Sequence, residues 1–137
     1  MAEDIEEIRQ QKLAELRNRA ETDDAEESVL KSPSEPIHIN GDAELSDTVA
    51  EYDLVLADFY ADWCGPCQML EPVVETIAGE TKATVVKIDI DSNQQLAAKY
   101  GVQGVPTLVL FADGQPAERL VGMQDEAQLR SVIEAHA

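Results

Sequence analysis

The run Leu54–Tyr60, with the sequence LVLADFY, limits the possible folds more than any other part of this 137-residue chain. Asp58 is its only charged residue. A strand with one solvated face alternates apolar and polar residues, whereas a strand covered on both faces is apolar almost throughout. The run therefore predicts a central strand in a sheet that has helices packed on both sides.

From Ile37 onward, short strand-like runs alternate with helical windows, which is the pattern of an α/β sandwich. Strands are predicted at Ile37–Ile39, Leu54–Tyr60, Thr84–Asp89, Thr107–Ala112 and Glu118–Val121. Helices are predicted over Ala43–Glu51, Gly65–Thr81, Asn93–Tyr100 and Asp125–Ala135. Asp113-Gly114 has the composition of a tight turn, so the last two strands are expected to be joined around it.

The first 36 residues differ in composition from the rest. Residues 1–20 are rich in helix-forming residues and lack Gly and Pro, so they are predicted to form a helical extension. Residues 21–36 combine acidic residues with Ser and Pro, as a flexible linker does. The folded domain is expected to span residues 37–137. The extension has two possible roles: a solvated helix, or a helix that docks on a partner or on another copy of the chain.

The chain is strongly acidic, with 28 Asp and Glu against 10 Lys and Arg and a net charge of −18. Such a charge repels phosphate backbones, so nucleic acid is not an expected partner. No run approaches the roughly 18 apolar residues of a membrane span, and acids stand where a signal peptide has bases. We therefore expect a cytoplasmic protein without membrane association. Because molar salt screens such repulsion, we hypothesise a salt-loving source; an ordinary acidic cytosolic protein is the alternative.

Cys64 and Cys67 are the only cysteines, and they lie in the sequence WCGPC at residues 63–67. Two cysteines are too few for a disulfide framework, so this pair indicates either redox chemistry or half of a metal site. A structural zinc ion needs four ligands. The remaining candidates, His38 and His136, come from opposite ends of the predicted domain, so we expect no metal.

The predicted junction of a strand and a helix suits the pair to dithiol chemistry. Unpaired backbone N–H groups in a first helical turn stabilise a thiolate, which makes Cys64 the predicted nucleophile. Cys67 lies one turn inward, where it can attack a mixed disulfide on Cys64 and release the reduced substrate. Pro66 is tolerated in the first turn and stiffens the loop between the two sulfur atoms.

Taken together, WCGPC after an apolar strand that bears an acid, and GVPT at residues 104–107, resemble the thioredoxin family. The resemblance covers residues 37–137 and implies a central mixed sheet of about five strands with two helices on each face. It implies a monomer that reduces disulfides in protein substrates by dithiol exchange and holds no bound cofactor. A thioredoxin reductase that draws on NADPH would recharge it.

Asp58 is predicted to be buried because its neighbours are apolar, and burial should raise its pKa. The family assigns an acid at this position the role of base for Cys67, directly or through a water molecule. The alternative is an aspartate that is merely tolerated at a strand end. By the same resemblance, Lys87 would approach Asp58 from the neighbouring strand and tune it.

The sequence alone does not choose between a cis and a trans bond at Val105–Pro106. Thioredoxins have a cis proline at the matching position, packed against the cysteines, which leaves the preceding backbone free to pair with an extended substrate. By this resemblance, the substrate-binding surface comprises Trp63, Gly65, Pro66, Gly104, Val105, Pro106, Gly122 and Met123. In an alternative interpretation, Val105 and Met123 are ordinary core residues.

The sequence departs from the family pattern at two positions. Tyr60 stands where many thioredoxins have tryptophan, and Gln68 follows the second cysteine where the family commonly has a base. With Asp62 and Glu71 close by in sequence, the potential around Cys64 should be unusually negative and should raise the pKa of its thiol at low salt.

Two other functions compete with disulfide reduction. The first is that of an oxidase or isomerase with the same fold, although Gly65-Pro66 between the cysteines resembles the reductants. The second is that of a binding or assembly module that acts through the N-terminal helix.

Overall fold

The computed structural model describes residues 33–137, so the predicted helical extension and most of the predicted linker lie outside the described residues. In order along the chain, the elements are β1 (Ile37–His38), α3 (Asp42–Glu51), β2 (Leu54–Tyr60), α4 (Gly65–Glu80), β3 (Thr84–Asp89), α5 (Gln94–Lys99), β4 (Thr107–Ala112), β5 (Gln115–Val121) and α6 (Glu126–Ala135).

The five strands form one mixed sheet in the order β1-β3-β2-β4-β5. β2 lies in the middle, parallel to β3 on one side and antiparallel to β4 on the other. β1 extends the sheet parallel to β3, and β5 extends it antiparallel to β4. Every residue of β2 except Tyr60 is buried, which confirms the prediction of a central strand covered on both faces.

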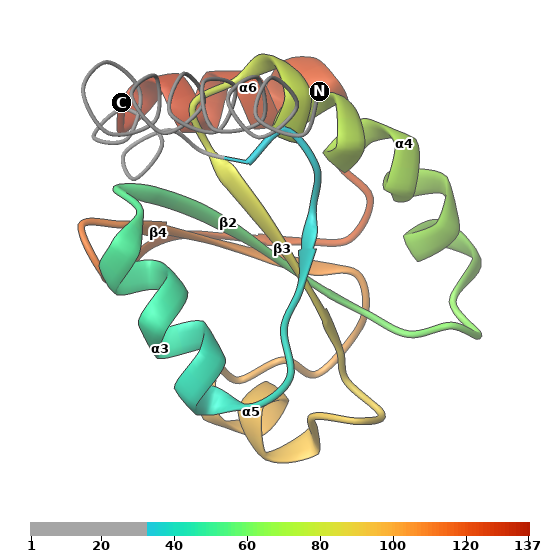
Figure 1. The fold of residues 1–137 in the computed structure, drawn as a ribbon. Helices are drawn as coiled ribbons and strands as arrows, with labels where there is room; N and C mark the ends of the chain where they lie inside the picture. The colour runs from blue at the N-terminus through green and yellow to red at the C-terminus, as the bar shows by residue number, and fades with distance from the viewer. Residues whose placement is uncertain (1–32) are drawn as a thin grey trace, which may run out of the picture. The chain divides into compact units, whose positions relative to one another are not determined.

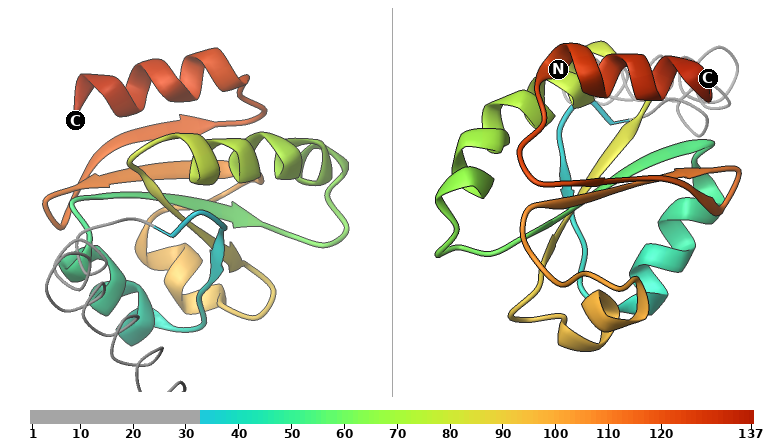
Figure 2. Two further views of the ribbon diagram at one scale, coloured as in Figure 1. Left: turned by 45° about the horizontal axis from the view of Figure 1, so that its top comes forward. Right: turned by 180° about the vertical axis from the view of Figure 1, so that it is seen from behind.

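Two helices cover each face of the sheet (Figures 1 and 2). On one face, Leu70, Val74 and Ile77 of α4 pack with Leu129 and Ile133 of α6 against the sheet. On the other, Leu45 of α3 and Leu96 of α5 pack against Phe59 and Phe111. The predicted thioredoxin architecture is therefore confirmed for the described domain.

β5 begins three residues before its predicted start at Glu118. The added residues Gln115, Pro116 and Ala117 are exposed, and β5 lies at the edge of the sheet, where a proline needs no ladder partner for its missing N–H. The turn before it is tight because Asp113 and Gly114 have φ values of 52° and 82°. These are the two left-handed residues of a type I′ hairpin turn, as the Asp-Gly pair predicts.

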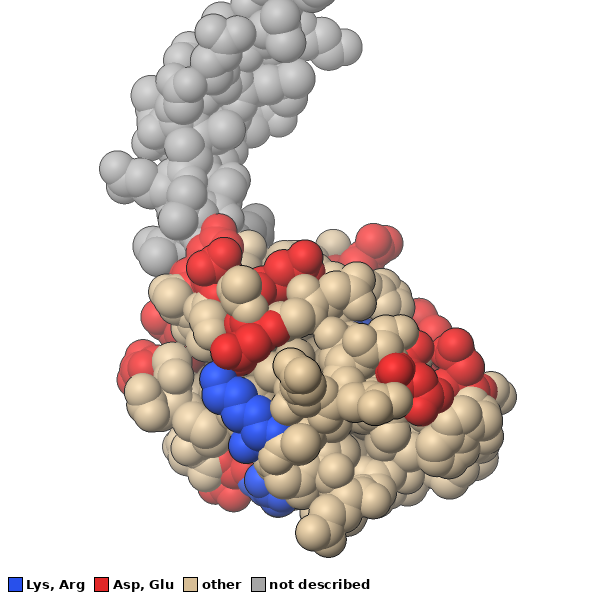
Figure 3. All heavy atoms as spheres, turned by 90° about the horizontal axis from the view of Figure 1, so that it is seen from below, with Lys and Arg blue, Asp and Glu red and all other residues tan. Residues whose placement is uncertain are grey.

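The surface of the domain is acidic. Residues 37–137 hold 17 Asp and Glu but only 5 Lys and Arg. Figure 3 shows carboxylates in several patches on one face, whereas most of the visible basic side chains lie in one narrow stripe. Within residues 33–137, the only buried charged residues are Asp58 and Lys87. None of the helices in this part of the chain combines the length and the hydropathy of a membrane span.

Candidate functional site

The two cysteines lie where β2 gives way to α4. Cys64 is the N-cap residue of α4, and Cys67 is in the first turn of the helix. The structure joins them in a disulfide with Cα atoms 5.2 Å apart. Both residues are buried, and the backbone N–H of Cys67 donates a hydrogen bond to Sγ of Cys64 over 3.1 Å. The helix N-terminus thus directs a donor at the sulfur atom on which the thiolate is predicted.

The local sequence explains this geometry. Cys64 has extended backbone angles, and its carbonyl group accepts the hydrogen bond from the N–H of Gln68, which begins the helix. Pro66 occupies the first turn, where no intrahelical acceptor exists for an N–H group. Gly65 and Pro66 are exposed, so the loop between the sulfur atoms faces solvent.

The Val105–Pro106 peptide bond is cis; the sequence alone did not choose between the cis and trans isomers. Val105 is half-buried and packs, with Tyr60, against the buried cluster that contains both cysteines. The carbonyl of Pro106, itself buried, accepts a hydrogen bond from the N–H of Gly122 over 2.8 Å. The loop at Gly122 is therefore tied to the loop that packs on the cysteines.

Exposed apolar side chains occur on the segments that make up this site. Trp63 is 69% exposed, and its indole N–H donates to a carboxylate oxygen of Asp91 over 2.9 Å. Met123 is 45% exposed, so the interpretation of this residue as part of the core is wrong. Gly104 is exposed as well.

Two further exposed apolar residues, which the sequence pattern did not predict as part of the surface, lie next to predicted site residues. Met69 follows Cys67 by two positions on α4, and Val121 immediately precedes Gly122. They are 67% and 68% exposed, respectively. The available signal was their adjacency to residues already selected for the surface.

Asp58 is fully buried in the middle of the sheet. It lies in register with Lys87 on β3 and with Leu108 on β4. Among the described residues, neither of its carboxyl oxygens has a hydrogen-bond partner. Burial raises the pKa of Asp58 from the usual 3.8 to about 7; the charge of Lys87 opposes the rise and that of Glu71 adds to it.

A cavity of about 400 Å³ is lined by both Cys67 and Lys87. Its walls come from β1, β2, β3 and α4 and the loop before that helix, and the lining residues are His38, Tyr60, Ala61, Asp62, Cys67, Gln68, Glu71 and Lys87. Cys67 and Lys87 therefore share one solvent-accessible space. Glu71, noted in the sequence only for its charge near Cys64, contacts Lys87 here at 3.5 Å.

The two histidines of the metal hypothesis have other neighbours. His38 stacks edge-on to Tyr60 with ring centres 6.4 Å apart, and His136 Nε2 lies 3.0 Å from a carboxylate oxygen of Glu118. Within residues 33–137, no group of three or more His, Cys, Asp or Glu side chains is arranged to hold a metal ion.

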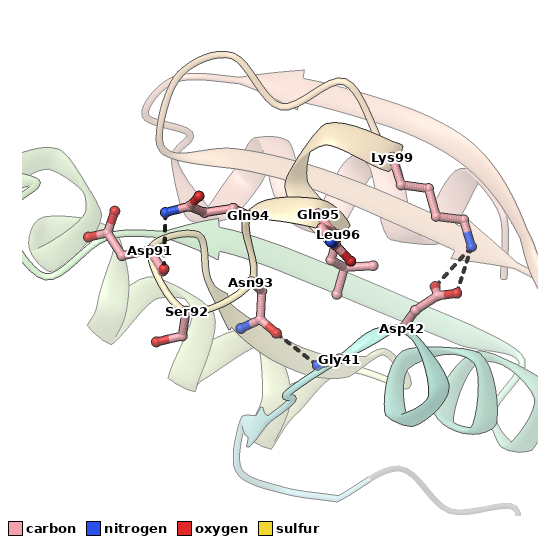
Figure 4. Close-up of a pocket in the computed structure, with 9 residues that line it drawn as sticks. All are labelled: Gly41, Asp42, Asp91, Ser92, Asn93, Gln94, Gln95, Leu96 and Lys99. Atoms are coloured by element: carbon pink, nitrogen blue, oxygen red, sulfur yellow. Dashed lines mark hydrogen bonds and ion pairs between the residues drawn. The ribbon is translucent and has the colours of Figure 1, made fainter.

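A second, polar hollow of about 610 Å³ lies between the start of α3 and the α5 region (Figure 4). Its side chains bond to one another: Lys99 pairs with Asp42 at 2.9 Å, and the backbone N–H of Gly41 donates to Asn93 over 2.8 Å. No thiol or imidazole is among the nine residues that line it.

Comparison with known proteins gives one consistent family. The family model described as Thioredoxin matches residues 36–135. The chain is 46% identical over 92 residues to thioredoxin from Staphylococcus aureus, which covers 66% of this chain and 88% of the relative.

Solved structures agree with the sequence comparison. A mutant thioredoxin from Halobacterium salinarum NRC-1 is similar with a TM-score of 0.76 and 63% identity, over 77% of this chain and 93% of that one. Thioredoxin from Fasciola hepatica is similar with a TM-score of 0.69 and 36% identity, over 74% of this chain and 99% of that one. The likeness to the Halobacterium protein agrees with the salt-loving source that the acid-rich composition indicates.

Proposed function

Because this chain belongs to the thioredoxin family, we propose that it works in the reducing direction, as a protein-disulfide reductase. The chain is a thiol–disulfide oxidoreductase whose redox-active pair is Cys64 and Cys67. The observation that carries the proposal is this pair at the start of α4, where the backbone N–H of Cys67 donates a hydrogen bond to Sγ of Cys64.

The reaction begins with the dithiol form. The thiolate of Cys64 attacks one sulfur atom of a target disulfide, so that a bond forms between Cys64 Sγ and the target. The other target sulfur leaves as a thiolate and takes a proton from solvent. The N–H groups of the first turn of α4 support this step because they stabilise negative charge on Cys64.

Resolution of the mixed disulfide uses Cys67. Its thiol proton passes to the carboxylate of Asp58, directly or through water, and its sulfur atom attacks Sγ of Cys64. The Cys64–Cys67 disulfide forms, and the second target sulfur leaves as a thiolate. Two electrons have then moved to the target. A base with a pKa of about 7 suits this transfer at neutral pH.

The target is proposed to dock beside the disulfide as an extended segment. The backbone of the exposed Gly104 and the half-buried Val105 would pair with it, because Val105 packs against the cluster that contains both cysteines. Trp63, Gly65, Pro66, Gly122 and Met123 would complete the surface. Met69 and Val121 are also exposed, and they lie next to these residues in the sequence.

Recharging of the pair is proposed to come from a thioredoxin reductase that uses NADPH, so that this chain needs no bound cofactor of its own. Such a cycle requires a reducing compartment, and the proposed location is therefore the cytoplasm. A monomer suffices for it, because both cysteines and the proposed base belong to one chain.

The proposal is tested by the rate of insulin disulfide reduction in the presence of dithiothreitol. We expect a fast rate for the wild type and the uncatalysed rate for Cys64→Ser. Cys67→Ser should accumulate a mixed disulfide with the target through Cys64, visible by mass spectrometry. If the wild type were no faster than Cys64→Ser, the binding-module alternative would be favoured over reduction.

A further inference from the structure

Lys87 is the only buried base among residues 33–137. Its side chain is 7% exposed. The ammonium group lies 3.5 Å from a carboxylate oxygen of Glu71 and 4.5 Å from the centre of the Tyr60 ring. Because a buried ammonium group is costly without a compensating anion or aromatic face, these two contacts account for how Lys87 is tolerated.

Asp58 is a second carboxylate within the same neighbourhood, but Lys87 does not bond to it. The two residues are register partners on adjacent parallel strands, which places them side by side in the sheet. Yet neither carboxyl oxygen of Asp58 has a hydrogen-bond partner in the described part of the chain. Two carboxylates are thus available to one ammonium group, which contacts the carboxylate of Glu71.

We propose that Glu71 is a positioning residue for the exchange reaction, which holds the Lys87 ammonium group at the cavity and away from Asp58, so that Asp58 can accept the Cys67 proton near neutral pH. This inference rests on the proposed function of Asp58 as the base. It gives Glu71 a part in the second step of the reaction.

The position of Glu71 on α4 supports this role. Glu71 follows Cys67 by four residues, so the two side chains lie on the same face of the helix, and both line the cavity that contains Lys87. A direct ion pair would lower the pKa of an aspartate by roughly 1 to 3 units and leave it a weak base. Glu71 instead adds to the rise in the pKa of Asp58, which Lys87 opposes.

Other titratable groups also face this cluster. β1 contributes His38, β2 contributes Tyr60, and the loop before α4 contributes Asp62. Glu35 and Glu75 line an adjoining cavity of about 410 Å³ that also reaches Lys87, and Asp89 ends β3. From β4, the residue opposite Asp58 is the apolar Leu108.

Glu75 provides a matched control for Glu71. It has the same charge, lies one turn farther along α4 and lines the adjoining cavity with Lys87. Both glutamates are exposed, so replacement by glutamine should leave the fold intact. A charge effect that depends only on overall acidity would be similar in both variants.

The experiment is a carboxyl carbon NMR titration of Asp58 in the oxidised, full-length protein. For Glu71→Gln, we expect the midpoint to move down by about 0.5 pH unit or more, because Lys87 is freed to pair with Asp58. For Glu75→Gln, we expect less than half of that movement. The difference between the wild type and Glu71→Gln should narrow in molar salt, which screens the half-exposed Glu71 carboxylate.

A second readout is the pH dependence of insulin disulfide reduction, whose midpoint should move in the same direction as the titration. An unchanged or higher Asp58 midpoint in Glu71→Gln would overturn the inference, as would equal movements in both variants. Failure of the proposed function has a different signature: insulin reduction by the wild type would not depend on Cys64, whatever the Asp58 titration showed.

Discussion

Replacing Asp58 by asparagine should make the domain more stable at alkaline pH. The pKa of Asp58 is raised by burial from 3.8 to about 7, so between these values the folded state keeps a proton that the unfolded state has lost. The free energy of unfolding therefore falls as pH rises through this window and stops falling above pH 7. The asparagine variant has nearly the same shape and lacks this titration.

The size of the effect follows from the pKa change. Each pKa unit corresponds to about 1.4 kcal/mol, so ionisation of Asp58 costs the folded state about 4 kcal/mol over the whole window. Between about pH 5.5 and about pH 9, which avoids the region of low net charge near the pI of 4.2, the cost is about 2 kcal/mol.

The assay is urea unfolding of the oxidised protein at several pH values, with the wild type, Asp58→Asn and the control Asp47→Asn. The disulfide removes the thiol titrations, and Asp47 is an exposed residue of α3. We expect the advantage of Asp58→Asn over the wild type to grow by about 2 kcal/mol from about pH 5.5 to about pH 9, with no such trend for Asp47→Asn. An advantage that stayed constant with pH would refute the assignment of a raised pKa to Asp58.

Two further predictions concern the surface. The urea midpoint of the wild type should rise between about 0.1 M and about 1 M NaCl, because residues 37–137 hold 17 acids against 5 bases and salt screens their repulsion; a midpoint that did not rise would contradict the salt-loving interpretation. Trp63→Ala should lower kcat/KM for insulin reduction about tenfold while leaving the dithiol reduction potential nearly unchanged, because the ring is 69% exposed and is proposed to contact the docked target rather than the buried cysteines. An unchanged kcat/KM would remove Trp63 from the proposed docking surface.

The elements with strong local patterns could be predicted from the sequence. Leu54–Tyr60 was predicted with its observed bounds because a strand buried on both faces leaves an uninterrupted apolar run. The first half of β5 was missed because Gln115, Pro116 and Ala117 are exposed on an edge strand and have no apolar alternation. The predicted helix start at Asp125 was one residue early because Asp125 is the cap, whose side chain accepts the N–H of Gln128.

The features of the site that depend on local sequence could be predicted. WCGPC places Cys64 at the N-cap of α4 and Cys67 in its first turn, and the apolar neighbours of Asp58 predict its burial. The contact of Glu71 with Lys87 was not readable, because it depends on how α4 packs across β3. The isomer of Val105–Pro106 was also beyond the sequence, because tertiary packing selects it.

The reduction potential of the Cys64–Cys67 pair tests the central claim most directly, because it decides the direction in which electrons flow. It can be measured by equilibrating the protein with glutathione buffers of known ratio and counting free thiols. The reduction potentials of thioredoxins lie at about −270 mV, and we expect this pair to be similarly reducing. A reduction potential of about −180 mV or higher, in the range of disulfide isomerases and oxidases, would contradict the proposal that the chain is a protein-disulfide reductase.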